Sequence, residues 1–401
     1  MSAANKSGTD AAAGSAVSLT VSRLLGALLA AALALAACGE PDPQDTAGIE
    51  LTGEPEAGTA AASEAQQPST TAADAVDDRG DADLLQTVQA RGRLLCGVSG
   101  TRVIFSETQP DGSVFGIDAD YCRVVAAAIF GDADSVEFVS LTTAERFAAL
   151  QSGHIDVLFR STTWTQSRDT EVGLDFGPVI YYDGQQLMAR ESDGFSASSQ
   201  VADIAGAVVC ALAGTTTEQN VSDAADAAGI GITLTTLEDF DTIIDNFITG
   251  ACDVTTADGS ALAGRKAKQQ PADEEWVIFP ATPISKEPLA PVYQQNQSRF
   301  GDVVNWAVYA TIIADEKGIT SDNVAEMVAS PPDAETRRLL GGEGELQSAM
   351  GLAPDAFYQA VSQVGNYGEI LARHLEPAGL TRGSINASWS DGGLIYAPPA
   401  R

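Results

Sequence analysis

The chain has 401 residues, enough to bury a sizeable core and more than one small domain needs. Hydrophobic residues make up 44% of it and charged residues 19%, as in ordinary globular proteins. Acidic side chains number 55 against 22 basic ones, which gives a formal net charge of −33. This balance argues against nucleic acid as a partner, because phosphate contacts need clustered lysine and arginine. The acidic balance is equally consistent with an exported protein, because a high net charge keeps such a protein in solution.

The first 38 residues have the organisation of a secretory signal peptide. Lys6 and Arg23 precede an apolar run of about 14 residues, too short to span a bilayer. The run ends in Leu-Ala-Ala-Cys, which resembles the lipobox of bacterial lipoproteins and implies that Cys38 becomes a lipidated N-terminus. Ordinary cleavage beside an unmodified cysteine is the alternative. No other stretch is long and apolar enough for a membrane span, so we expect an extracytoplasmic protein in the periplasm or on the outer face of the cell membrane.

Residues 39–83 are rich in alanine, glycine, acidic residues, serine, threonine and proline, and almost devoid of large apolar side chains. Such a segment cannot bury enough apolar surface to offset the entropy lost on ordering. We therefore expect a disordered acidic linker between the anchor and the folded part.

Strands and helices alternate from about Leu84 onward. The pattern predicts a helix from residue 84, a strand over 94–100, a helix ending at Gly131, a strand over 135–141, a helix over 142–153 and a strand over 155–161. In the second of these helices, apolar residues such as Ile117, Tyr121 and Val124 recur at helical spacing. The order predicts a parallel sheet covered by helices.

A second block of the same kind begins near residue 201. It predicts a strand over 204–214, a helix over 215–229, a strand over 232–237, a helix over 238–250 and a strand over 252–258. Extended connectors at 181–190 and 284–293 lead into this block and back. We therefore expect two α/β lobes: residues 84–187 and 291–401 form a discontinuous lobe 1 with a C-terminal helical extension, and residues 188–290 form lobe 2.

Five cysteines are present, and a lipidated Cys38 leaves Cys96, Cys122, Cys210 and Cys252. An even number in an oxidising compartment predicts two disulfides, although sequence alone leaves three pairings open. The division into lobes favours Cys96–Cys122 and Cys210–Cys252, each worth about 2–4 kcal/mol. No C-x-x-C pair is present, so we expect no zinc site.

Several stretches together resemble the substrate-binding proteins of ABC amino-acid importers, solute-binding protein family 3, and especially the general L-amino-acid type. They include GIDADYCRVVAAAIFGD, ERFAALQSGHIDVLFRSTTWTQSRD, YYDGQQ, LAGTTTE, ISKEPLAPV and GGLIYAPPAR. The resemblance implies a two-lobe type II periplasmic-binding-protein fold, a free L-amino acid with a polar or acidic side chain as ligand, ABC permease subunits as partners, a monomer and no cofactor. The lipobox and the long acidic linker are less typical of that group.

A zwitterionic amino acid needs a bidentate donor for its carboxylate and an acid for its ammonium. The resemblance implies that Arg168, in TQSR, binds the α-carboxylate together with Ser161 and Thr163. On lobe 2 it implies Thr216, at a helix start whose free N–H groups favour an anion, and Asp258 as the acid for the α-ammonium. An ordinary structural role stays open for each of these residues. Arg168 could be a surface charge, Thr216 an N-cap and Asp258 a turn residue, and the hydroxyl residues Ser161 and Thr163 could be polar side chains at a strand end.

Two further positions near this motif have an open role. Arg160 either reaches an acidic ligand side chain or pairs with a neighbouring carboxylate, and Phe105 either walls the pocket or belongs to the core. Asp118 and Asp120 are expected to be loop and cap residues, because two carboxylates do not make a metal site.

Three functions fit the sequence to different degrees. We expect a binding component of an amino-acid importer, with a lipid-anchored amino-acid sensor as the alternative. A dehydratase-like enzyme on the same fold is a third possibility, but the chain has only two histidines and neither lies in a catalytic motif. No P-loop or dinucleotide motif is present, so we expect no catalytic residues.

Overall fold

The structure is a computed structural model that describes residues 83–401. The signal peptide, the lipidated Cys38 and almost all of the predicted linker lie outside the described residues. Within the described range, none of the helices combines the length and hydrophobicity that crossing a membrane requires.

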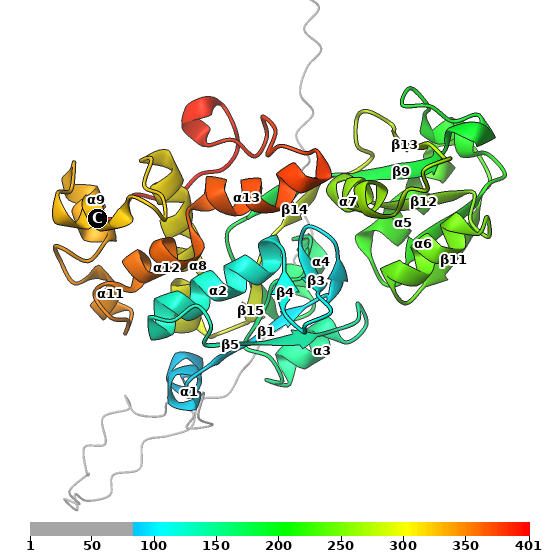
Figure 1. The fold of residues 1–401 in the computed structure, drawn as a ribbon. Coiled ribbons are helices and arrows are strands. Elements are labelled where there is room, and N and C mark those ends of the chain that lie inside the picture. The colour runs from blue at the N-terminus through cyan, green and yellow to red at the C-terminus, as the bar shows by residue number, and fades with distance from the viewer. Residues whose placement is uncertain (1–82) are drawn as a thin grey trace, which may run out of the picture. The chain divides into compact units, whose positions relative to one another are not determined.

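The first lobe is built on a five-stranded sheet in the order β5-β1-β6-β15-β7 (Figure 1). β1 pairs in parallel with β5 and β6, whereas β15 returns antiparallel from the second half of the chain. The strands are β1 Leu94–Val98, β5 Val136–Ser140, β6 Val157–Leu158, β7 Leu174–Phe176 and β15 Val292–Gln294, and the helices before the second lobe are α1 Leu84–Arg91, α2 Ile117–Phe130, α3 Arg146–Gln151 and α4 Gln166–Thr170. A small antiparallel sheet of β2 Thr101–Arg102, β3 Ser106–Thr108 and β4 Val114–Phe115 precedes α2.

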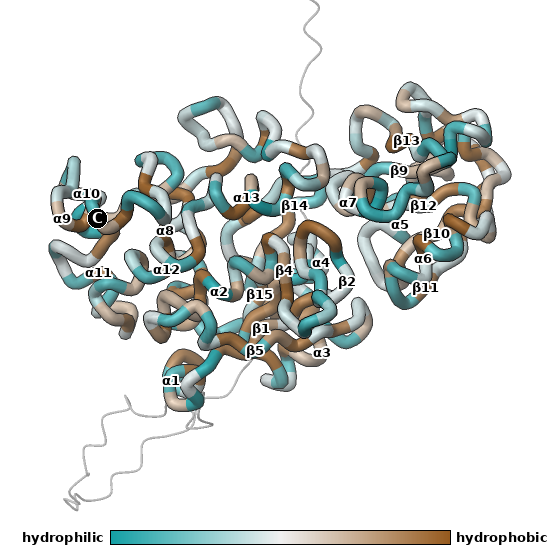
Figure 2. The backbone as a smooth tube through the Cα atoms, viewed as in Figure 1, coloured by the Kyte–Doolittle hydropathy of each residue, from teal (hydrophilic) through white to brown (hydrophobic). Residues whose placement is uncertain are grey.

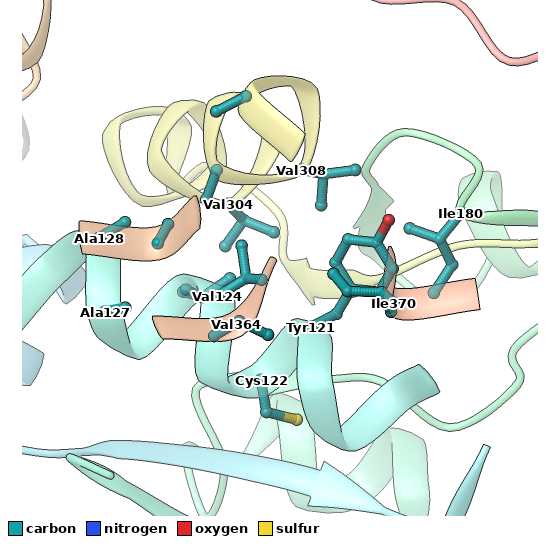
Figure 3. Close-up of a cluster of buried hydrophobic side chains, with 14 of the residues drawn as sticks. Tyr121, Cys122, Val124, Ala127, Ala128, Ile180, Val304, Val308, Val364 and Ile370 are labelled. Atoms are coloured by element: carbon teal, nitrogen blue, oxygen red, sulfur yellow. The ribbon is translucent and has the colours of Figure 1, made fainter. Parts of the chain in front are cut away.

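The core of this lobe surrounds α2, which is buried along almost its whole length. Tyr121 and Val124 of α2 face Val304 and Val308 of α8 (Ser298–Glu316) in Figure 3. The C-terminal helices complete the same core, because α12 and α13 both pack on α2. These helices are α9 Val324–Ala329, α10 Ala334–Leu339, α11 Leu346–Ala349, α12 Ala356–Val364 and α13 Tyr367–Leu375. The C-terminal region is thus part of lobe 1 rather than a separate appendage.

The second lobe has its own five-stranded sheet, in the order β11-β10-β12-β9-β13. β10 is parallel to β11 and β12, while β9 runs antiparallel to both of its neighbours. Its elements are β9 Gln185–Arg190, β10 Val208–Leu212, α5 Thr216–Ala228, β11 Thr233–Leu237, α6 Phe240–Ile248, β12 Val254–Asp258, α7 Gly259–Gln269 and β13 Trp276–Phe279. α7 and β13 were not among the predicted elements, and β9, which was predicted only as part of the extended connector 181–190, is a strand of this sheet.

A two-stranded antiparallel ribbon joins the two sheets: β8 Tyr181–Asp183 leads into lobe 2 and β14 Glu287–Leu289 leads back. The chain therefore crosses twice between the lobes, as in the predicted type II two-lobe fold, and that fold class is confirmed. Short 3-10 helices, η1 Glu191–Asp193, η2 Val201–Ile204, η3 Glu376–Ala378 and η4 Trp389–Asp391, fill some of the loops.

The local sequence explains most of these elements. β1, with the sequence LLCGV, is buried and is coloured largely as hydrophobic in Figure 2. One helix is shorter than its predicted span of 142–153, because Thr142 and Glu145 bond to each other in a turn before α3 begins at Arg146. Two disulfides, Cys96–Cys122 and Cys210–Cys252, lie one in each lobe and confirm the pairing that the lobe division favoured.

Candidate functional site

Glu287, on the ribbon strand β14, connects the two lobes. Its Oε2 accepts hydrogen bonds from the hydroxyls of Thr163 in lobe 1, at 2.6 Å, and Thr216 in lobe 2, at 2.9 Å. Its Oε1 accepts a bond from the Asn220 amide at 2.9 Å and one from Ser285. The hydroxyls of Thr163 and Thr216, which sequence reasoning assigned to opposite lobes of one site, therefore converge on a single carboxylate that is 1% exposed.

Arg168 lies beside this junction, on the short helix α4. Its Nη1 donates to the Thr163 carbonyl at 2.8 Å, and its guanidinium lies 5.7 Å from the centre of the Phe147 ring. Burial lowers the pKa of Arg168, and the carboxylates of Glu287 and Asp258 partly offset that effect. The carbonyl contact uses one of the five N–H donors of a guanidinium, so the side chain keeps capacity for a bound carboxylate.

The helix α5 directs its N-terminus toward the same region. Thr215 is its N-cap and accepts a bond from the Glu218 N–H at 3.2 Å, which leaves the first N–H groups of the helix without helical partners. A cavity of about 640 Å³ lies between this helix start and Arg168. Free N–H groups at a helix start favour an anion, so lobe 2 supplies carboxylate-binding capacity opposite lobe 1.

Asp258 and Asp183 form a carboxylate pair at the lobe 2 edge of the ribbon. Asp258 ends β12, which pairs with Gln185 at the start of β9, and the Gly259 N–H donates to the Gly184 carbonyl at 2.9 Å. Burial, followed by the charge of Asp183, raises the pKa of Asp258 to about 8. Burial also raises the pKa of Asp183 to about 6, although Ser260 donates to this carboxylate. Arg102 Nη1 lies 3.9 Å from Asp258 Oδ2, too far for a hydrogen bond, so the two carboxylates can still accept a bound ammonium group.

Ser161 has a different role from its hydroxyl neighbours. Both its N–H and its hydroxyl donate to Asp118 Oδ2, at 2.9 and 3.1 Å. Its φ of 44° lies in the left-handed region that disfavours side chains, so these two bonds hold a strained turn at the end of β6. Burial raises the pKa of Asp118 to about 6. Asp118 and Asp120 both lie in the first turn of α2, so the expectation of loop and cap residues is wrong, and Asp118 is instead a buried helix residue that supports the site loop.

Arg160 and Phe105 lie on the lobe 1 side. Arg160 donates to the Leu141 carbonyl at 2.9 Å and to the Thr143 hydroxyl at 3.2 Å, and it lines a cavity of about 170 Å³ between the lobes. Its hydrogen-bond partners are therefore a carbonyl and a hydroxyl rather than a neighbouring carboxylate. Phe105 is 1% exposed and makes an edge contact with Tyr181 at 5.8 Å, next to the ribbon.

Sequence reasoning missed four site residues: Glu287, Asp183, Arg102 and Arg146. Glu287 and Asp183 lie in the connectors 284–293 and 181–190, whose extended character gave no hint of a buried carboxylate. Arg102 and Arg146 are 7% and 3% exposed, although arginine is normally a surface residue. Only the tertiary structure could identify them as buried charges. Among residues 83–401 no group of acidic, histidine and cysteine side chains is arranged to hold a metal.

Two α/β lobes on a two-stranded ribbon, with arginines, hydroxyls and carboxylates gathered where they meet, define a two-lobe solute-binding protein. Residues 94–310 match the bacterial extracellular solute-binding proteins, family 3. The chain is 43% identical over 323 residues to the glutamate/glutamine/aspartate/asparagine-binding protein of Rhodobacter capsulatus, an alignment that covers 80% of this chain and 94% of that protein. It is 40% identical over 325 residues to the general L-amino acid-binding periplasmic protein of Rhizobium johnstonii, covering 80% and 93%.

A solved structure gives the same result. A periplasmic binding protein of an ABC transporter from Brucella ovis, with glutathione bound, aligns with a TM-score of 0.76 and 42% identity over 80% of this chain and 100% of that one. The protein therefore belongs to the bacterial extracellular solute-binding proteins of family 3. The relatives named here are binding proteins.

Proposed function

We propose that the protein is the extracytoplasmic substrate-binding component of an ABC amino-acid importer. It binds a free L-amino acid between its lobes and delivers it to the permease subunits. The observation that carries this proposal is the convergence of Thr163, Thr216 and Arg168 beside the carboxylate pair Asp183–Asp258. Relatives that align over most of their length are named as binding proteins for amino acids.

The proposed ligand pose follows from the charges. Arg168 takes the α-carboxylate, with the N-terminus of α5 at Thr216 as the second anion-binding element. Asp258 takes the α-ammonium, which supplies a closer positive charge than Arg102, whose Nη1 lies 3.9 Å from the Asp258 carboxylate. Because these groups come from both lobes, ligand binding favours the closed arrangement.

The remaining candidate site residues have supporting roles in this proposal. Ser161 and Thr163 shape the carboxylate end of the cleft through their bonds to Asp118 and Glu287. Phe105 supports the pocket from the core side, since its ring is buried against Tyr181. Arg160 contributes positive charge from the cavity wall.

The proposal includes an anchored monomer. A lipid at Cys38 holds the two lobes, divided as 84–187 with 291–401 and 188–290, at the outer face of the membrane or in the periplasm. Delivery to a permease requires release of an unchanged ligand, so the proposal assigns no catalytic residue and no cofactor. The cleft arginines and carboxylates are suited to holding a zwitterion, and the two histidines lie elsewhere in the sequence, at His154 and His374.

Calorimetry with the common L-amino acids tests this function. At micromolar affinity the binding free energy is about −8 kcal/mol, well within calorimetric range. The expected result is saturable one-to-one binding of at least one amino acid, which mass spectrometry recovers unchanged after incubation. Absence of binding across the panel, or chemical conversion of the ligand, would contradict the proposal. Radiolabelled lipid incorporated by the wild type but not by Cys38→Ala tests the anchor.

A second candidate ligand is glutathione, whose γ-glutamyl end carries the same zwitterion as a free amino acid. The observation that favours it is the 42% identical relative solved with glutathione bound, together with a cavity of about 640 Å³ at the Arg168 side of the site. Adding glutathione to the calorimetric panel decides between the two. A lipid-anchored sensor would bind the same ligands, and uptake of labelled ligand in cells with and without this protein separates transport from sensing.

A further inference from the structure

Arg146 is a buried arginine without a counter-ion among the residues that the structure describes. It is 3% exposed, its Nε has no hydrogen-bond partner, and no ion pair joins it to any residue within 83–401. Burial lowers the pKa of its guanidinium well below the usual value, and the charges of Arg168, Arg160 and Arg102 lower it further. A buried charge in this situation is costly unless an anion pairs with it.

Arg146 lies next to the proposed carboxylate site. Its guanidinium carbon is 4.6 Å from the centre of the Phe147 ring, and that of Arg168 is 5.7 Å from the same ring. The two arginines therefore share one aromatic side chain. Glu145, the residue before Arg146, lines the cavity between the lobes, so this part of the chain stands at the cleft.

Arg102 is the second buried arginine with unused hydrogen-bonding capacity. It is 7% exposed, and its Nη1 has no hydrogen-bond partner among the described residues. Its closest carboxylate oxygen is Asp258 Oδ2 at 3.9 Å, beyond hydrogen-bond distance. The guanidinium lies over the Phe240 ring of lobe 2 at 4.8 Å, so it stands where the two lobes meet.

A cavity of about 170 Å³ at this point has two buried arginines in its lining. These are Arg102 and Arg160, but Arg160 already donates hydrogen bonds to the Leu141 carbonyl and the Thr143 hydroxyl. The acidic residues that also line it are Glu145, Glu238 and Asp239. Glu145 accepts the Thr142 hydroxyl at 2.7 Å and Asp239 the Thr242 hydroxyl at 2.6 Å, while Glu238 is exposed. None of these three carboxylates makes an ion pair with Arg102 or Arg146 within the described part of the chain.

We propose that Arg102 and Arg146 form a second anion subsite, which binds the side-chain carboxylate of an α-amino acid that carries two carboxylates. The inference rests on the proposed function, in which Arg168 and Asp258 hold the zwitterion end. Without ligand, Arg102 Nη1 is the cation next to Asp258 Oδ2, at 3.9 Å. When the ligand ammonium binds Asp258, it replaces Arg102 as the partner of this carboxylate. Arg102 is then released to the second carboxylate, and Arg146 gains the counter-ion that it lacks. Glutamate, aspartate and the γ-glutamyl peptide glutathione share this chemistry.

The test compares ligands that differ only in the second charge. Calorimetry measures the Kd of glutamate, aspartate, glutamine, asparagine and glutathione for the wild type, Arg102→Gln, Arg146→Gln and Arg146→Lys. Arg337→Gln is the matched control, because it removes the same charge from an arginine whose side chain is 45% exposed on the C-terminal helices. Circular dichroism melting verifies that each variant is folded before binding is measured.

The wild type is expected to bind glutamate at least about tenfold more tightly than glutamine, a difference typical of a charge-assisted pair. Arg102→Gln and Arg146→Gln are expected to remove most of that preference while the Kd of glutamine changes by less than about threefold. Arg146→Lys keeps part of it, and Arg337→Gln keeps all of it. If the second carboxylate is instead the distal one of glutathione, the same two variants weaken glutathione selectively, which also supports the subsite.

Two outcomes overturn the inference. One is an unchanged ratio of glutamate to glutamine affinity in both glutamine variants, with glutathione binding also unchanged. The other is an equal loss for all ligands, which would make the arginines structural. In either case the wild type still binds amino acids and the proposed function stands. A wild type that binds no ligand of the panel would end both proposals, so the two failures are distinguishable.

Discussion

Asp183 and Asp258 are buried carboxylates, and the charge of Asp183 raises the pKa of Asp258. Burial is the main cause of their high pKa values, about 6 for Asp183 and about 8 for Asp258, and the charge of Asp183 is the second cause for Asp258. Arg102 and Arg168 act in the opposite direction, and Glu287 adds to the rise. The pair therefore stores a proton at neutral pH that an ammonium ligand can replace.

The first prediction concerns proton release on binding. At pH 7, below the pKa of Asp258, the amino-acid ammonium needs an ionised partner, so binding expels up to about one proton and tightens as the pH rises toward 8. Calorimetry at pH 7 in two buffers with different ionisation enthalpies gives the number of protons released. Asp258→Asn is the control and should release almost none. Equal proton release by the two proteins would contradict the assignment.

The same groups affect stability without ligand. An acid whose folded-state pKa is raised holds its proton in the folded state after the unfolded chain has lost it, so its contribution to the free energy of unfolding falls as the pH rises. For Asp258 the fall begins near the unfolded pKa of about 3.9 and ends above the folded pKa of about 8. Urea unfolding at several pH values should show the wild type losing stability relative to Asp258→Asn across that window. A constant difference would contradict the raised pKa.

Arg168 is expected to be needed for every amino-acid ligand, whatever its side chain. Arg168→Ala removes the proposed partner of the ligand α-carboxylate from a partly buried site. The binding of every ligand should therefore weaken by roughly 2–5 kcal/mol. Arg168→Lys keeps the charge without the bidentate geometry, so its affinity for each ligand should lie between that of the wild type and that of Arg168→Ala. The calorimetric panel measures both, with Arg337→Ala as the exposed control. Full affinity in Arg168→Ala would show that the α-carboxylate binds elsewhere.

Glu287 is expected to stabilise the junction of the lobes through its acceptor oxygens. Glu287→Gln turns one end of the carboxylate into an NH2 group, which then faces hydroxyl or amide donors instead of accepting from them. The cost in unfolding free energy is about 1–3 kcal/mol. Chemical denaturation of this variant measures the cost, with the exposed-turn variant Glu145→Gln as a control. A loss no larger than that of the control would contradict the bridging role.

How much of this site the sequence could predict depends on how each residue acts. The lobes follow from periodicity and glycine-terminated helices, and Thr163, Thr216 and Asp258 stand at strand ends or helix starts, where local pattern indicates a site. Arg146 could not be found in this way. It belongs to an amphipathic helix pattern in which an arginine signals a solvated face, and only packing from other elements buries it. Glu287 lies within the proline-broken connector 284–293, which has no periodicity, so its burial is likewise a tertiary property.

The C-terminal region reaches the ribbon through Asn386. This side chain is 1% exposed; it accepts a hydrogen bond from the Tyr182 N–H at 2.6 Å and donates one to the Tyr182 carbonyl at 2.9 Å. Tyr182 pairs on its other side with Pro288 of β14. The Asn386 side chain therefore pairs with the outer edge of β8 at Tyr182, as a neighbouring strand would. This edge belongs to the ribbon that joins the two lobes.

Asn386→Ala is expected to leave both backbone groups of Tyr182 without these partners, and hydrogen exchange measured by mass spectrometry should be faster in the segment around residue 182. The unfolding free energy should fall by about 1–3 kcal/mol, the usual cost of leaving buried polar groups unpaired. Asn323→Ala is a matched control, because Asn323 also accepts from one backbone N–H, that of Thr320 at 2.7 Å, and donates to one carbonyl, that of Gly318 at 2.9 Å. It should destabilise its own turn and leave exchange at Tyr182 unchanged. Equal exchange at residue 182 in the two variants would mean that the C-terminal region does not restrain the ribbon.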